Sequence, residues 1–130
     1  MVSYEKLVEL AMHARKNAYC PYSGFAVGAA LLCKDGTVYT GCNIENASYS
    51  PTNCAERTAI FKAVSEGRRD FLAIAIVGGK DELQKCYPCG VCRQVMNEFC
   101  DEQFEVICGV TSDDFEVIKM EDLLPKSFQF

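Results

Sequence analysis

The sequence predicts an α/β fold of three layers, in which helices cover both faces of a mixed five-stranded sheet. Two observations support this fold class: an apolar segment is followed by a tight turn and a returning strand, and strand–helix–strand units come after this hairpin. A chain of 130 residues with 49% hydrophobic residues can form the core of one domain, so we treat residues 1–130 as a single unit.

The first predicted elements are a helix and a hairpin. Apolar residues recur at helical spacing from Leu7 to Ala14, with Ser3 as a plausible N-cap, and a Pro-Tyr-Ser-Gly turn ends this helix. The apolar run Phe25–Cys33 is typical of a strand, and Asp35-Gly36 is a strong hairpin signal before the returning strand. The returning strand covers Thr37–Cys42, and residues 43–53 form a polar loop.

The second half of the chain alternates helices and strands. A helix is expected from Cys54 to Glu66, with Gly67 as its C-terminal stop. The continuously apolar segment Phe71–Val77 is typical of a strand buried on both faces, and the Gly-Gly pair after it is expected to break the strand. The remaining predicted elements are a helix at 89–99, strands at 104–110 and 115–120, and a short helical turn at 121–124.

Two short cysteine motifs lie where the two later helices are predicted to begin. Cys54 opens the first motif, and Cys89 and Cys92 belong to a Pro-Cys-x-x-Cys segment. Three thiolates suit one zinc ion, and zinc held by three protein ligands keeps a fourth position open for water. Glu56 supplies the carboxylate that a hydrolytic site needs to move protons. The pattern therefore predicts a catalytic zinc centre, with thiolates favoured by the positive ends of two helices.

Together with Phe25–Leu31 and Asn43–Tyr49, these motifs resemble those of the small, homotetrameric cytidine deaminases. The resemblance covers nearly the whole chain. It implies a cytidine deaminase-like fold, one zinc ion per subunit on the three cysteines, and Glu56 as the catalytic proton shuttle. It also implies hydrolytic deamination of cytidine and deoxycytidine to uridine and deoxyuridine, with release of ammonia, in pyrimidine salvage.

The same resemblance assigns the residues that bind substrate. It implies that Asn43 and Glu45 hold the ribose hydroxyls and that Phe25 stacks near the pyrimidine. The backbone amide of Ala55 is expected to meet the pyrimidine carbonyl. Two further residues are expected to reach sites built partly by neighbouring subunits, namely Tyr49 and Phe128.

Arg57 is a candidate for tuning the charge of the centre. Three thiolates make a zinc site formally anionic and so a weaker Lewis acid. Arg57 lies three positions after Cys54 and can offset part of that charge. We therefore expect Arg57 to support zinc retention or turnover.

Charge and composition limit the partners. The net charge is −5 with no run of like charges, which argues against a nucleic-acid polymer as partner, because such binding needs a clustered basic face. The N-terminal segment carries several charged residues and lacks the apolar run of a signal peptide. No segment approaches the length of a membrane span. We expect a cytoplasmic protein with free thiols, no membrane contact and a small nucleoside as substrate.

Other interpretations of the same residues stay open at this stage. Asn53 and Glu56 fit a capping box that merely closes a helix start. Cys86 could join the three motif cysteines in a closed, structural zinc site without turnover. Phe25 could be a plain core residue, and Asn43 and Glu45 could be turn formers. A deaminase of the same fold could also act on another aminopyrimidine such as blasticidin S, or on a polynucleotide.

Overall fold

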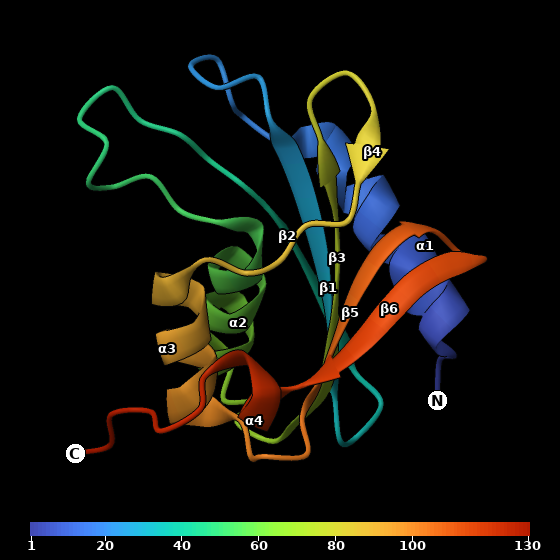
Figure 1. The fold of residues 1–130 in the computed structure, drawn as a ribbon, viewed down its shortest axis with the longest axis vertical. Coiled ribbons are helices and arrows are strands. Elements are labelled where there is room, and N and C mark those ends of the chain that lie inside the picture. Colours follow the sequence, from blue (N-terminus) through green and yellow to red (C-terminus); the bar gives the residue numbers. More distant parts are fainter.

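The computed structural model describes residues 1–130 and contains one mixed sheet with helices on both faces (Figure 1). The strand order is β2-β1-β3-β5-β6, and a two-residue strand, β4, pairs with the end of β3. The strands are β1 (Ala26–Cys33), β2 (Val38–Cys42), β3 (Phe71–Gly79), β4 (Leu83–Gln84), β5 (Glu105–Thr111) and β6 (Asp114–Lys119). The helices are α1 (Tyr4–Ala14), the 3-10 turn η1 (Arg15–Asn17), α2 (Ala55–Ser65), α3 (Gly90–Phe99) and α4 (Met120–Leu123).

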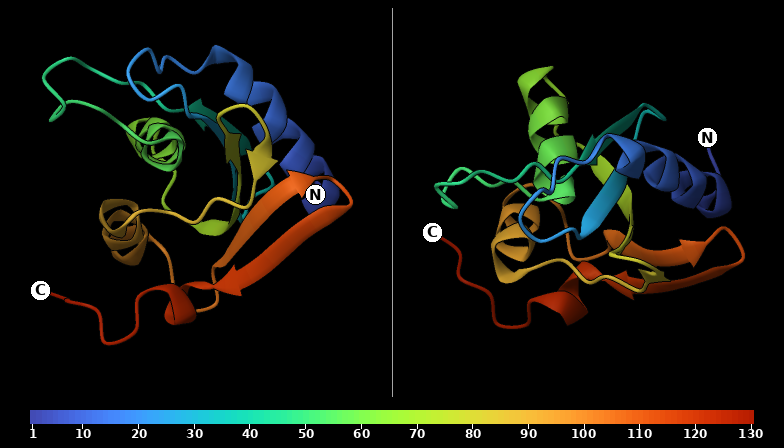
Figure 2. Two further views of the ribbon diagram at one scale, coloured as in Figure 1. Left: turned by 45° about the horizontal axis from the view of Figure 1, so that its top comes forward. Right: turned by 90° about the horizontal axis from the view of Figure 1, so that it is seen from above.

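This arrangement confirms the predicted fold class. Strand β3 pairs in parallel with β5, and the other pairs are antiparallel, so the sheet is mixed. Helix α1 covers one face, while α2 and α3 lie on the other, as the turned views in Figure 2 show. None of the helices has the length and apolar character needed to cross a membrane.

Alternation along the central strands explains their continuous apolar sequence. In β3, Ile74 and Ile76 pack in the cluster beneath α2 and α3, whereas Ala73, Ala75 and Val77 pack beneath α1. Successive side chains of a strand point to opposite faces, so a strand between two helical layers needs apolar residues at every position.

Two details differ from the prediction. The sheet has six strands rather than five, because the short strand β4 was not predicted. Gly78 and Gly79 do not break the strand; they are its last residues and pair with β4. A Cβ atom at Gly79 would lie 2.0 Å from the carbonyl oxygen of Glu82. The two glycines therefore allow a close hairpin backbone, which local propensity alone does not distinguish from a strand end.

The two helices that carry the cysteine motifs are held close to the sheet and begin at the expected residues. Cys54 and Cys89 are the N-caps of α2 and α3 in extended conformation. A Cβ at Gly41 of β2 would lie 2.6 Å from the backbone nitrogen of Ala59, so this glycine lets α2 approach the sheet. Gly67 follows the end of α2 with a φ of 90°, as predicted for its stop.

Candidate metal centre

The three motif cysteines converge on one point between the starts of α2 and α3. The Sγ atoms of Cys54, Cys89 and Cys92 all lie within 4.8 Å of one another, and those of Cys54 and Cys89 are 3.8 Å apart. Thiolates bound tetrahedrally to one zinc ion at about 2.3 Å lie about 3.8 Å from each other. The donor set and its spacing therefore fit zinc, and these three residues would hold it.

Arg57 reaches this cluster from the first turn of α2. Its Nη2 atom donates a hydrogen bond to the Sγ atom of Cys54 at 3.3 Å, while its Nε atom is buried without a hydrogen-bond partner. Among the protein groups, the hydrogen bond with Cys92 and then the contact with Arg57 lower the pKa of the Cys54 thiol to about 5, against the effect of burial. The guanidinium of Arg57 therefore contacts Cys54, the thiol whose charge the sequence predicts it to offset.

Glu56 is the buried carboxyl group beside the cluster. Only 4% of its surface is exposed, and it lines the same cavity of about 280 Å³ as Cys54 and Cys89. Burial is the main reason that its pKa is raised to about 7, and the hydrogen bond to its carboxylate comes from its own backbone N–H. A carboxyl group with a pKa near neutrality, bonded to no other side chain, is suited to accept and return a proton.

The capping-box interpretation of Glu56 is wrong. The N-cap of α2 is Cys54 rather than Asn53, and no side chain caps this helix start. The Asn53 amide instead donates to the Oγ1 atom of Thr58 at 3.0 Å. Glu56 therefore faces the cavity without a role in closing the helix.

The closed four-cysteine site is also unsupported. Cys86 lines the cavity, but the cluster of possible metal ligands contains only the other three cysteines. The Cys86 thiol donates to the carbonyl oxygen of Gln84 at 3.4 Å. Three ligands are the arrangement typical of a catalytic zinc ion.

Four predicted substrate residues line the cavity with Glu56. Phe25 comes from the segment just before β1, and Ala55 is the first residue of α2. The other two lie on the segment that follows β2 and are Asn43 and Glu45.

Glu45 is held in place by a turn that the sequence had marked only as the end of a helix. The backbone N–H groups of Tyr22 and Ser23 donate to its Oε1 atom at 3.0 and 3.1 Å, and the Ser23 hydroxyl donates to Oε2. The hydrogen bond from the Ser23 side chain is the main reason that the pKa of Glu45 is lowered. Glu45 is therefore a fixed, ionised acceptor on the cavity wall. Ser23 is a site residue that sequence reasoning missed.

The side chain of Asn43 bonds to the backbone at the start of β1 and also lines the cavity. Its Nδ2 donates to the carbonyl oxygen of Phe25 at 2.7 Å, and its Oδ1 accepts from the N–H of Val27 at 2.9 Å. These bonds fix the entry to β1, so the amide is oriented before any ligand binds. An amide has two N–H groups and two lone pairs, so one of each remains for a ligand.

The last two predicted residues lie outside the main cavity of the chain. Tyr49 is 76% exposed and lines an adjoining cavity of about 410 Å³ that shares Ser23 and Glu45 with the main one. Phe128 is 70% exposed in the C-terminal tail and lines a separate cavity with Phe130. A single chain therefore brings Tyr49 to the edge of the site and leaves Phe128 away from it.

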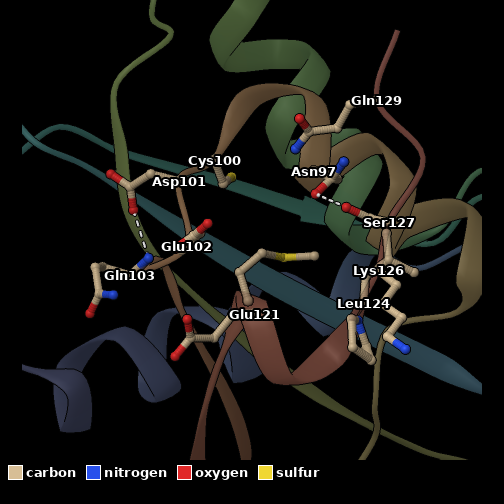
Figure 3. A pocket seen from close by; sticks show the side chains of 12 residues that line it. Asn97, Cys100, Asp101, Glu102, Gln103, Glu121, Leu124, Lys126, Ser127 and Gln129 are labelled. Carbon is tan, nitrogen blue, oxygen red and sulfur yellow. Dashed lines mark hydrogen bonds between the residues drawn. The ribbon is translucent and has the colours of Figure 1, made fainter.

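The largest cavity of the chain is elsewhere. It measures about 540 Å³ and lies among the end of α3, α4 and the tail, where Ser127 donates a hydrogen bond to Asn97 (Figure 3). Its lining includes Asp101, Glu102 and Glu121 but none of the three clustered cysteines. Size does not identify the site here, because the metal ligands and the buried carboxyl group are in the smaller cavity.

Comparisons with known proteins agree with this geometry. The family model described as "Cytidine and deoxycytidylate deaminase zinc-binding region" matches residues 1–108. A cytidine deaminase of Halalkalibacterium halodurans is 55% identical over 124 residues, which cover 95% of this chain and 92% of the relative. The crystal structure of a cytidine deaminase from Burkholderia pseudomallei is similar with a TM-score of 0.90 and 48% identity, over 98% of this chain and 100% of that one. A blasticidin-S deaminase of Bacillus cereus is 36% identical over 87 residues, 62% of each chain.

Proposed function

The chain belongs to the family of cytidine and deoxycytidylate deaminases, and we infer that it is a zinc-dependent hydrolase that deaminates cytidine and deoxycytidine. The reaction consumes one water molecule, forms a carbonyl at C4 of the ring and releases ammonia, which leaves uridine or deoxyuridine. The observation that carries this conclusion is the buried Glu56 in one cavity with two of the three clustered thiols.

The chemistry divides between the metal and the protein groups. Bound zinc supplies a Lewis acid that makes water a better nucleophile at neutral pH. Glu56 takes a proton from the attacking water and delivers protons to ring N3 and to the departing amino group. Its raised pKa suits both directions of transfer, because donor and acceptor forms are then accessible near pH 7.

The remaining cavity residues orient the nucleoside. The backbone N–H of Ala55 donates to the pyrimidine carbonyl, and Phe25 packs against the ring. The fixed carboxylate of Glu45 and the free N–H of Asn43 bind the ribose hydroxyls. These roles are supported by the position of all four residues on the wall that Glu56 shares.

The lining favours a nucleoside over its phosphate. No lysine or arginine lines the main cavity or the adjoining one, and the ionised Glu45 belongs to both. A phosphate would meet a like charge without a cation to offset it, which costs affinity. We therefore propose cytidine and deoxycytidine, rather than nucleotides or a polynucleotide, as substrates.

We further propose that the enzyme acts as a homotetramer in the cytoplasm, in pyrimidine salvage. Exposed apolar residues occur on α2, α3, the 43–53 loop and the tail, elements that gather on one side of the molecule (Figure 1). A shared interface there would bring Phe128 and Tyr49 of one copy toward the cavity of another. All nine cysteines are free thiols, as is typical of a reducing compartment. Analytical ultracentrifugation tests the tetramer, and a monomer with full activity would overturn it.

Activity is tested with zinc-loaded protein and cytidine, with uridine and ammonia both quantified. Glu56→Gln is expected to lower kcat by about 100- to 10,000-fold while zinc stays bound, because it removes the proton carrier but no ligand. Glu121→Gln is the matched control, since this exposed carboxylate has no hydrogen-bond or ion-pair partner in the chain. Cytidine 5′-phosphate, blasticidin S and single-stranded DNA are tested alongside. Deamination of one of these without any of cytidine would overturn the substrate assignment.

A further inference from the structure

The segment between β4 and α3, residues 85–89, carries Cys89 to the metal centre and has little backbone support. Residues 85–88 make no backbone–backbone hydrogen bond. The segment runs from β4 across to the start of α3 (Figure 1). An extended stretch without such bonds has to be held by side-chain contacts if its last residue is to be placed accurately.

Two of these side-chain contacts come from β6. The hydroxyl of Tyr87 donates to the Oε1 atom of Glu116 at 2.8 Å, and the Nζ atom of Lys85 lies 3.6 Å from Oδ1 of Asp114. From α3, Arg93 also donates from Nε to the carbonyl oxygen of Pro88 at 2.7 Å. The edge strand of the sheet thus contacts the segment just before its metal ligand.

Strand periodicity explains why two acids of β6 meet the same segment. Phe115, between them, packs against the core cluster beneath α1, so Asp114 and Glu116 point to the opposite face, which carries the metal centre. Their partners, Lys85 and Tyr87, are also separated by one residue. Two extended segments therefore meet through alternate side chains.

The two contacts differ in strength. The Lys85–Asp114 pair is exposed on both sides, and such pairs contribute little. The Tyr87–Glu116 bond is exposed too, but its length of 2.8 Å is that of a well-formed hydrogen bond, and a bond to a carboxylate is stronger than a neutral one. Tyr87 also lines the cavity beside Cys89 and Glu56, so its ring forms part of the site wall.

We propose that Tyr87 and Glu116 are positioning residues, whose hydrogen bond anchors the 85–89 segment to β6 and so fixes the orientation of Cys89 and of the adjacent cavity wall. The proposal rests on the proposed function in one respect, that Cys89 binds zinc. Loss of the anchor leaves all three thiols and Glu56 present but lets the segment move. Zinc should then dissociate faster although its ligands are unchanged.

The test measures transfer of zinc from the loaded protein to an excess of a chromogenic chelator. Tyr87→Phe removes the hydroxyl that donates the bond, and Glu116→Leu removes the carboxylate that accepts it, because leucine has no polar atom. Each is expected to speed zinc release by about three- to tenfold, the effect of losing one solvent-exposed hydrogen bond. The double variant should release zinc no faster than the faster single variant, because the two residues act through one bond.

Matched controls separate this effect from general destabilisation. Tyr19→Phe removes another exposed tyrosine hydroxyl, and Glu121→Leu removes another exposed carboxylate. Neither side chain has a hydrogen-bond partner in the chain. Both should release zinc at the wild-type rate, and Asp114→Asn should change it less than about twofold. Wild-type release rates in the two single variants, or effects that multiply in the double variant, overturn the proposal. Because no substrate is present, absence of deaminase activity would leave this result intact.

Discussion

Replacement of Arg57 by alanine would remove the cation from the zinc thiolates while leaving every ligand in place. The Nη2 atom donates to Cys54 at 3.3 Å, and the contacts with Cys54 and Cys92 raise the pKa of the guanidinium despite burial, which lowers it. A hydrogen bond between charged groups contributes about 1.5–3 kcal/mol. At about 1.4 kcal/mol for each factor of ten, zinc affinity should fall by about 10- to 100-fold.

The stability of the zinc-free protein should change much less than its zinc affinity. The Nε atom of Arg57 is already buried without a partner, so alanine also removes an unsatisfied polar group. The assay is competition for zinc with a chelator of known affinity, with thermal unfolding of the metal-free variants in parallel. Arg57→Lys keeps the positive charge but loses the planar guanidinium group. Its zinc affinity should lie between those of the wild-type protein and Arg57→Ala. The reasoning would be refuted if Arg57→Ala and the wild-type protein bound zinc with affinities within twofold of each other.

Further predictions follow from three structural contacts. Ser23→Ala removes a hydroxyl donor to Glu45 and should raise KM for cytidine by about three- to tenfold with a smaller change in kcat, as steady-state kinetics would show. Gly28→Ala should lower the free energy of unfolding by about 1–3 kcal/mol or more in denaturant titrations, because the added Cβ would lie 2.0 Å from a carbonyl oxygen of α1. The hydroxyl of Tyr4 donates to Glu105, and burial is the main reason that its pKa is raised to about 12. Its contribution to the free energy of unfolding should therefore be complete below pH 10 and lost as the pH rises through 12.

Each of these predictions has a matched control. Ser23→Thr keeps the hydroxyl and should restore a near-normal KM; equal KM values for alanine and wild type would contradict the role of the bond. Gly90→Ala adds a methyl group where no atom lies within 4 Å, so it should leave stability nearly unchanged. Tyr4→Phe should show less loss of melting temperature between pH 10 and 12 than wild type, and identical curves would exclude the tyrosine as the cause.

Local patterns were sufficient for most of the fold and for the metal centre. The Asp35-Gly36 turn, the N-cap at Ser3 and the stop at Gly67 act within a few residues of chain, so short segments already contain their physical causes. The metal ligands were predicted in the same way. Cys54 and Cys89 each stand at the start of a helix, and cysteines at two helix starts indicate one shared site. The prediction failed at Gly78-Gly79, because pairing with β1, which lies much earlier in the chain, continues the strand through both glycines.

By itself, the sequence determined the class of fold, the three thiols and the carboxyl group that make the centre, because residue type and spacing carry that chemistry. Only the tertiary structure decided how these groups are held. Ser23 reaches Glu45 across 22 positions, and Tyr87 reaches Glu116 across 29. Such pairs depend on the order of strands in the sheet and on which face each residue occupies. These are properties of the assembled chain rather than of any short segment.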